Sequence, residues 1–125
     1  MAKGFEDLEI WKKAHELSVK IYDLTSNKWP KSEIFGLISQ IRRAAVSVEL
    51  NIAEGQARYH YNETIHFLHD ARASAQEVRN CLMLARDIKE ISLELEEFEY
   101  FDVEYIGLIK GINGFVSYLR SKKSS

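Results

Sequence analysis

A stripe of hydrogen-bonding side chains is the part of this 125-residue chain best suited to chemistry. It lies in the segment QIRRAAVSVELNIAEGQAR, residues 40–58, where polar residues step by three or four, the period of one helix face. A face that meets only water needs no more than Lys and Glu, so this mixture indicates hydrogen-bonded packing or recognition. The stripe consists of Gln40, Arg43, Ser47, Asn51 and Glu54.

Two interpretations of this stripe follow from its composition. In the first, it packs with Ser74 and Glu77 of a later helix as an internal network, which would fix helix register at some cost in stability. In the second, it is a surface for another subunit or a partner, with Arg and Asn giving directional contacts. The sequence leaves both interpretations open.

A second candidate site interleaves charge with aromatic rings. The run Arg58-Tyr59-His60-Tyr61 falls in an expected connection, and such a run is typical of contacts with single-stranded nucleic acid. The alternative is that Tyr59 and Tyr61 cover the end of the helices while Arg58 pairs with Glu54, four residues earlier. The residues predicted for nucleic-acid contact are Arg42, Arg58, Tyr59, Tyr61 and Arg72.

A ladder of arginines follows in the next helical pattern. Arg72, Arg79 and Arg86 recur every seven residues, which places them on one helix face. We expect them to pair with the acidic residues that begin the last helix, within the chain or between subunits. Arg86 also has Glu90 as a partner one turn later. A row of phosphate-binding groups is the alternative.

The histidines and nucleophiles of the chain complete no recognisable site. Glu63 and His66 form one Glu-x-x-His step, with His69 three residues on, whereas a di-iron bundle needs two such steps and carboxylates from two further helices. The candidate nucleophiles Ser47, Ser74 and Cys81 stand at no spacing that pairs them with a histidine. The sequence therefore predicts no metal, no cofactor and no enzymatic activity.

Four helical patterns position these residues. Their apolar residues alternate steps of three and four, the spacing that shallow-angle bundle packing requires. The connections are short, so neighbouring helices should run antiparallel. The predicted fold is all-α, a single domain over residues 1–125 built as an up-down-up-down four-helix bundle. The expected helices cover residues 6–27, 31–54, 62–90 and 94–121.

Pro30 and Gly55 mark two of the expected boundaries. The residue before a proline is disfavoured in helical conformation, so the first helix should end ahead of Pro30, which then opens the second. Gly55 is expected to end the second helix in a left-handed conformation.

The last helix carries more apolar residues than one core requires. Gly107, Gly111 and Gly114 also step along it by four and three, and each costs ~1 kcal/mol of helix propensity relative to alanine. We expect close packing here, against another subunit. A frayed, weakly helical C-terminal half is the alternative. The additional apolar residues are Val103, Ile106, Ile109 and Val116.

Composition indicates a cytoplasmic protein without a broad basic surface. Residues 1–60 hold nine Lys and Arg against eight Asp and Glu, and residues 61–125 hold eight against eleven, for a net charge of -2. This balance disfavours nonspecific nucleic-acid binding. The N-terminus lacks the apolar core of a signal peptide, and no uncharged run of ~18 apolar residues predicts a membrane span. Cys81 is expected to pack as a small hydrophobe.

Several blocks of sequence resemble one bacterial family. The chain is similar, over about residues 5–120, to the four-helix-bundle proteins encoded within intervening sequences of 23S ribosomal RNA genes. The block from Asn51 to Gly55, followed by Arg58, is its most specific part. The blocks are FEDLEIWKKA at 5–14, WP at 29–30, GL at 36–37, QIRRAA at 40–45, SV at 47–48, NIAEG at 51–55, FL at 67–68 and AR at 71–72, with Ser74 and Glu77.

The resemblance implies a cytoplasmic homo-oligomer, a ring of five copies. A distantly similar bundle is an accessory subunit of reverse transcriptases of diversity-generating retroelements, where it contacts polymerase and nucleic acid. Those accessory proteins are strongly basic, whereas this chain is slightly acidic. The chain departs from the family pattern at Glu49-Leu50, where a proline and a small residue are usual, at Ala73 in place of glycine, and at His60 in place of a serine cap.

Two functional hypotheses follow. The first is a non-enzymatic, ring-forming interaction module that docks protein or nucleoprotein partners. The second is an RNA- or DNA-binding accessory protein that acts through a basic rim of the assembled oligomer. A salt-dependent affinity for nucleic acid would distinguish the second from the first.

Overall fold

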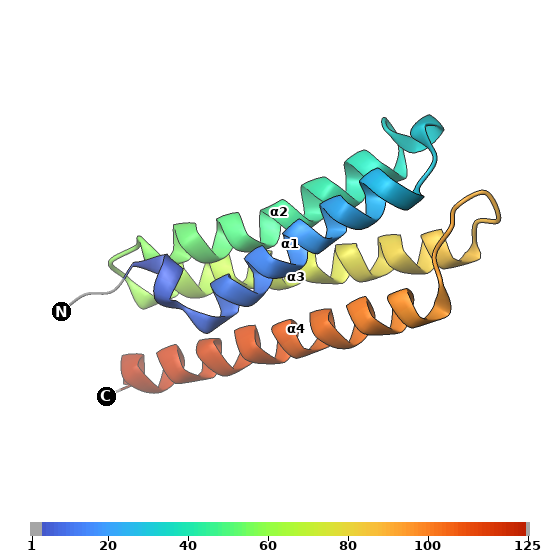
Figure 1. The fold of residues 1–125 in the computed structure, drawn as a ribbon. Helices are drawn as coiled ribbons and strands as arrows, with labels where there is room; N and C mark the ends of the chain where they lie inside the picture. Colours follow the sequence, from blue (N-terminus) through green and yellow to red (C-terminus); the bar gives the residue numbers. More distant parts are fainter. Residues whose placement is uncertain (1–3, 125) are drawn as a thin grey trace.

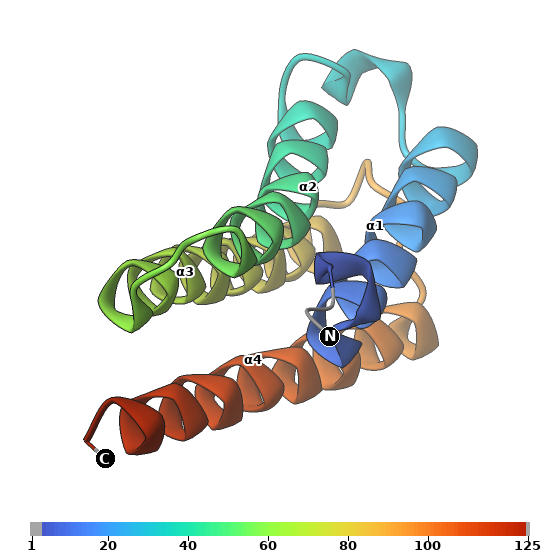
Figure 2. The ribbon, with the colours of Figure 1, turned by 90° about the vertical axis from the view of Figure 1, so that its left-hand side faces the viewer.

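Four long helices make up most of the chain. The computed structural model describes residues 4–124, in which no strand occurs. Figure 1 shows that successive helices run in alternate directions, and Figure 2 shows α2 and α4 on diagonally opposite sides of the bundle. The elements are the 3₁₀ turn η1 (Phe5–Asp7), α1 (Glu9–Lys28), the 3₁₀ turn η2 (Lys31–Glu33), α2 (Leu37–Gln56), α3 (Tyr61–Asp87) and α4 (Leu95–Ser124).

The first two helices begin later than the periodicity predicts. Leu8 has extended backbone between η1 and α1, so the first α-helix starts at Glu9. The expected second helix is divided in two. Pro30 precedes the short turn η2, and α2 begins only at Leu37, whose backbone N–H donates to the Glu33 carboxylate at 3.0 Å. That carboxylate satisfies one of the N–H groups that the first turn of a helix leaves without a partner.

The later helices keep their predicted type with shifted ends. Ile88 adopts extended backbone, so α3 ends at Asp87 instead of residue 90. Helix α4 continues through all three glycines to Ser124, and the alternative of a frayed C-terminal half is therefore wrong.

Gly55 is helical, which corrects the prediction of a left-handed stop. No glycine among residues 4–124 has a positive φ, and α2 continues to Gln56. A Cβ on Gly55 would lie 3.1 Å from Cβ of Phe67 and 3.2 Å from the backbone oxygen of Thr64. The Thr64 hydroxyl donates to the Gly55 carbonyl at 2.8 Å. Gly55 is thus required for the close approach of α2 and α3, not for a turn.

The core runs along the whole bundle and is filled by the residues of the three-four repeats. Helices α2 and α3 share the most extensive contact, and the alanines buried on them let the two backbones lie close together. On α4, the core also takes in Ile109 and Val116, whereas Val103 is 63% exposed. Part of the additional apolar arc therefore serves the chain's own core. The side chains buried most completely include Leu17, Ile21, Ile41, Val48, Ile52, Leu68, Val78, Leu82, Tyr105 and Ile112.

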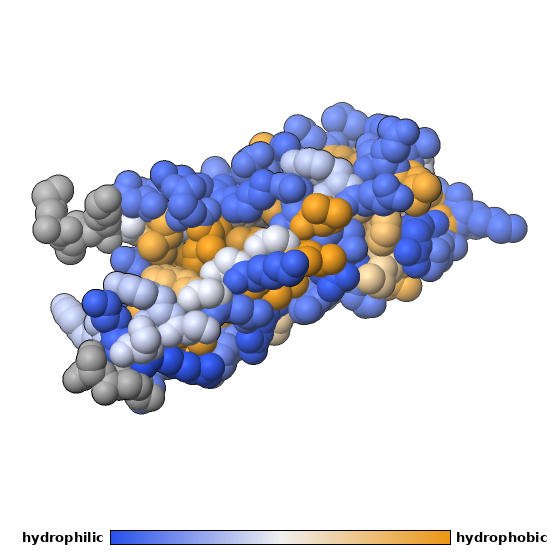
Figure 3. Space-filling view, turned by 90° about the horizontal axis from the view of Figure 1, so that it is seen from below, coloured by the Kyte–Doolittle hydropathy of each residue, from blue (hydrophilic) through white to orange (hydrophobic). Residues whose placement is uncertain are grey.

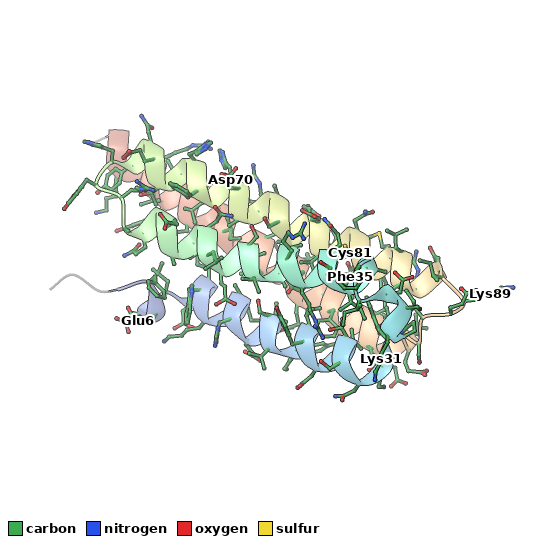
Figure 4. All side chains as sticks on the ribbon, turned by 90° about the horizontal axis from the view of Figure 1, so that it is seen from above. Glu6, Lys31, Phe35, Asp70, Cys81 and Lys89 are labelled. Atoms are coloured by element: carbon green, nitrogen blue, oxygen red, sulfur yellow. The ribbon has the colours of Figure 1, made fainter. Side chains whose placement is uncertain are left out.

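The two ends of the bundle carry different connections. Figure 4 shows Lys31 and Phe35, in the α1–α2 connection, at the same end as Lys89, in the α3–α4 connection. The α2–α3 turn and both chain ends lie at the other end. Within residues 4–124, no helix is both long and apolar enough to cross a membrane.

Candidate interaction surfaces

Some residues of the polar stripe on α2 face α3, and others do not. Gln40 hydrogen-bonds to Glu77 of α3, and the Ser74 hydroxyl donates to the Ser47 hydroxyl at 2.9 Å. The Asn51 amide donates within α2 to the Ser47 carbonyl and hydroxyl, at 2.9 and 3.1 Å. These five residues form a polar seam between α2 and α3, the arrangement that the internal-network interpretation describes. Such a seam fixes the register of the two helices.

Arg43 and Glu54 lie outside this seam. Arg43 is exposed and makes no hydrogen bond or ion pair within residues 4–124. Glu54 accepts from Arg58 at 3.0 Å, which is the i,i+4 pair that the sequence suggests. At about 100° per residue the stripe is about 80° wide on α2, and Arg43 and Glu54 lie along one edge of it. Its members therefore serve different surfaces.

Arg42 joins α1 to α2. Its Nε donates to the Thr25 hydroxyl and its Nη2 to the Ser26 hydroxyl, each at 2.9 Å, and its guanidinium lies 4.5 Å from the ring centroid of Tyr22. Thr25 is buried, and its hydroxyl in turn donates to the Ile21 carbonyl. Sequence reasoning missed this contact because Thr25 stands 17 residues from Arg42 and shares no motif with it.

The predicted nucleic-acid residues are not brought together in one site. Arg42 and Arg58 stand near opposite ends of α2, about 24 Å apart along a helix. Tyr59 is 97% exposed, so it does not cover the bundle end as the alternative expects, whereas Tyr61 is 43% exposed. The Arg58 guanidinium lies 4.7 Å from the ring centroid of Phe67. The Arg58 end therefore carries two exposed aromatic rings, those of Tyr59 and Tyr61.

Basic side chains gather on α3 and the last turns of α4. Arg72 donates to the Asn113 side chain at 2.8 Å. Burial lowers the pKa of His69, and the nearby Arg72 and Arg120 lower it further. His66 shares a groove of about 330 Å³ with Arg58 and Phe67. We call His66, His69, Arg72 and Arg120 the basic corner.

The basic corner is not purely positive. Asp70, labelled on α3 in Figure 4, lies 3.6 Å from His66 Nε2, and Glu63 lines the groove beside Arg58. No group of three or more His, Cys, Asp or Glu side chains is placed to hold a metal ion in the part of the chain that the structure describes.

The arginine ladder makes three different contacts. Arg79 Nε donates to Asp102 of α4 at 2.8 Å, so the expected pairing with the acidic start of the last helix is present at this position. Arg86 pairs with its neighbour Asp87 at 2.9 Å, instead of the expected Glu90, and its guanidinium lies 4.7 Å from the Phe98 ring centroid. Together with the bond from Arg72 to Asn113, the ladder holds α3 to α4 along its length.

The three glycines of α4 have different surroundings. A Cβ on Gly111 would lie 3.0 Å from Cγ2 of Ile10, so this position allows α1 to approach α4. At Gly107 and Gly114 a Cβ would meet nothing within 4 Å. A groove of about 220 Å³ runs between α1 and α4 beside Gly107 and Gly111. Figure 3 shows apolar side chains at the surface between the two chain ends on this side of the bundle.

Sequence reasoning missed the apolar groove between α1 and α2. It has a volume of about 400 Å³, and its walls include Val19 and Tyr22 of α1 and Val46 of α2. Leu50, one turn beyond Val46, is 58% exposed. The signal was present: Val46 and Leu50 fall on the helix face opposite the core-facing repeat.

Comparisons with known proteins agree with this fold. A crystal structure of a protein of unknown function from the S23 ribosomal protein family of Bacteroides thetaiotaomicron superimposes with a TM-score of 0.74 at 22% identity, covering 86% of this chain and 97% of that one. No curated protein matches the chain in sequence. The 23S rRNA-intervening sequence protein family matches residues 6–114. The chain therefore belongs to the family of 23S rRNA-intervening sequence proteins.

Proposed function

We propose that this protein is a non-enzymatic, self-assembling helical module of the cytoplasm whose oligomer docks protein or nucleoprotein partners. The observation that carries the proposal is the exposure of large apolar side chains on regular helix faces. Val19, Leu50 and Val103 are each more than half exposed, although all three lie in the middle of long helices. Apolar side chains in such positions are typical of association surfaces.

The candidate nucleophiles have structural roles that support the non-enzymatic part of the proposal. The hydroxyls of Ser47 and Ser74 are bonded to each other in the polar seam. Cys81 is buried, and burial raises the pKa of its thiol to about 11, with Glu77 adding to the shift. A thiol with that pKa is almost entirely protonated at neutral pH and is a weak nucleophile.

Self-assembly is tested by measuring mass in solution. Light scattering after size-exclusion chromatography, together with native mass spectrometry, should give a defined multiple of the 14.5-kDa chain, and the family resemblance implies five copies. A monomer at every accessible concentration would refute the proposal. A defined oligomer of another size would retain self-assembly and reject the five-fold ring.

Nucleic-acid binding is the second candidate function, and the basic corner favours it. Arg72 and Arg120 both lie near His69 on α3, the helix that follows the connection exposing Tyr59, and such cations could hold a phosphate backbone while Tyr59 stacks on an unstacked base. The net charge of the whole chain argues against broad electrostatic binding, which makes a local site the form to test.

Fluorescence anisotropy with a short single-stranded RNA tests this candidate. Affinity should fall steeply between about 50 mM and 200 mM salt, and Arg72→Gln/Arg120→Gln should weaken it while Lys89→Gln does not. Lys89 is a matched control because it is exposed and lies at the other end of the bundle. If the wild type shows no binding at low salt, or if all variants bind alike, this candidate is rejected.

A further inference from the structure

We propose that copies of this chain associate through two different faces, the outer face of α2 in one copy and the outer face of α4 in the next, with the two helices parallel. This inference rests on the proposed self-assembly and specifies the surfaces that perform it. Two independent features support it: the shape of the two faces and the distribution of their charges.

The outer face of α2 is apolar for most of its length. Its residues step by four and three on the side opposite the buried repeat of Ile41, Val48 and Ile52. Leu50 projects from its centre, and the α1–α2 groove with Val19 borders it. The α2 outer face consists of Ser39, Arg43, Val46, Leu50, Ala53 and Ala57.

The outer face of α4 has the complementary shape. Its residues also step by three and four, and glycines leave a shallow depression at its centre. Gly107 and Gly114 have open space above them, unlike Gly111, which meets Ile10 of the same chain. Val103, one turn before Gly107, is largely exposed. The α4 outer face consists of Glu96, Glu99, Val103, Gly107, Lys110 and Gly114.

The spacing of the two faces allows them to interlock. Leu50 follows Arg43 by seven residues, about 10.5 Å along a helix, and Gly107 follows Glu99 by eight, about 12 Å. A parallel arrangement with Arg43 beside Glu99 therefore brings the Leu50 side chain over the gap at Gly107. Close packing of a large side chain over a glycine is a general way for two helices to approach.

Charges select the direction of this pairing. Arg43 on α2, and Glu96 and Glu99 on α4, are exposed and form no ion pair with any residue between 4 and 124. Each lies in the first turns of its helix, and α2 and α4 begin at the same end of the bundle (Figure 1). Parallel helices of neighbouring copies thus bring the positive start of one beside the negative start of the other.

Two different faces on one chain make the contact heterologous. Since α2 and α4 lie diagonally opposite in the bundle (Figure 2), each copy can use both faces at once. Repetition of such a contact produces a ring when the rotation between copies closes and a filament when it does not. A two-fold contact of α4 with α4 is the main competitor, because it would also bring the acidic start of that helix near its basic end.

Complementation between two variants tests the inference. Leu50→Asp disables the α2 face and Val103→Asp the α4 face, and each exposed position tolerates the change in the folded monomer, as circular dichroism will verify. Each variant alone should lose higher assemblies, with self-association weakened by more than about tenfold because a carboxylate would be buried unpaired. Their equimolar mixture should form dimers and nothing larger, because only one intact face of each kind remains.

The alternatives give different results in the same experiment. A two-fold α4 contact predicts that Val103→Asp dissociates the oligomer while Leu50→Asp does not. It also predicts that the mixture of the two variants gives no 1:1 complex. Leu84→Asp, at an exposed position of α3 away from both faces, is the control and should assemble like the wild type. If the wild type is an oligomer and both Leu50→Asp and Val103→Asp leave it intact, this inference fails while self-assembly stands. A monomeric wild type rejects the proposed function itself.

A charge exchange tests the direction of the helices. Arg43→Glu and Glu99→Arg should each weaken association, since each places like charges together, and the double variant should recover most of the loss. The double variant recovers association only if position 43 of one copy contacts position 99 of another. If the double variant is weaker than both single variants, the parallel pairing is rejected.

Discussion

At the scale of single residues, Gly55 and Gly114 have opposite surroundings although both are helical. Alanine at position 55 would force its methyl group against Phe67 and the Thr64 carbonyl, so we expect Gly55→Ala to lower the free energy of unfolding by about 1–2 kcal/mol despite alanine's better helix propensity. Alanine at position 114 meets nothing and should raise it by about 0.5–1 kcal/mol. Urea unfolding of the two variants at a low protein concentration gives both values, and equal effects at the two sites would contradict the tight contact at Gly55.

Cys81 makes stability depend on pH in the alkaline range. Its thiol has a pKa of about 11 in the folded chain because it is buried, whereas the thiol of an unfolded cysteine has a pKa of about 8.5. Between these values the folded chain keeps a proton that the unfolded chain loses, so stability is fully present below about pH 8.5 and falls as pH rises toward 11.

The alanine variant isolates this contribution of the thiol. The free energy of unfolding of the wild type should fall more steeply between about pH 8.5 and 11 than that of Cys81→Ala, with both measured by urea titration. Burial also raises the pKa of Tyr105, but that group is present in both proteins and cancels in the comparison. Parallel pH curves would show that the thiol is not held in its neutral form by folding.

At the scale of the helices, the ion pair between Arg79 and Asp102 fastens α4 to α3. Both side chains are only 21% exposed, whereas Arg86 and Asp87 on the same ladder are 41% and 66% exposed. We therefore expect Arg79→Gln to lower the free energy of unfolding by about 1 kcal/mol and Arg86→Gln to change it by a few tenths at most. A double-mutant cycle with Asp102→Asn measures the coupling directly, and a coupling energy near zero would show that the pair does not join the helices.

The helices themselves were predictable because burial in a bundle leaves a three-four repeat in the sequence. The repeat from Ile41 to Ile52 is fully buried as it predicts. The left-handed stop at Gly55 was wrong because glycine has two uses, a turn and a close contact, and sequence does not distinguish them. The partners of Arg42 on α1 could not be predicted either, since their contact depends on how two helices are rotated against each other.

The candidate surfaces were predictable to a lesser degree than the helices. Reading the polar stripe as one surface assigned Arg43 to the same side as Ser47, whereas the helix rotates it outward. The significance of Leu50 was likewise hidden, because a single exposed leucine is ordinary until the groove beside it is seen. Residue types predict which helix face is buried, but only the rotation of each helix decides what the remaining faces can contact.

At the scale of the whole molecule, one end of the bundle carries exposed charges that form no ion pair within residues 4–124. Near the connections of α1 with α2 and of α3 with α4, exposed cations such as Lys31 and Arg43 belong to the first pair of helices, and carboxylates such as Glu96 and Glu99 belong to α4. An ion pair already joins α1 to α4 at this end of a single copy, but α2, which carries Arg43, lies diagonally opposite α4 (Figure 2). Neighbouring copies that use the two faces described above would bring these charges together.

Ionic strength should therefore weaken the assembly in a way that depends on Arg43. Between about 0.1 M and 1 M salt the Debye length falls from about 10 Å to about 3 Å, so attraction between partly exposed charges is largely screened. Sedimentation equilibrium should show self-association of the wild type weakening several-fold over this range, while Arg43→Gln, weaker at low salt, changes much less. Arg43→Gln serves as the control, because salt affects the apolar contacts of the wild type and of the variant equally. Identical salt dependence of the two would mean that Arg43 meets no opposite charge in the oligomer, and apolar packing alone would then have to orient the copies.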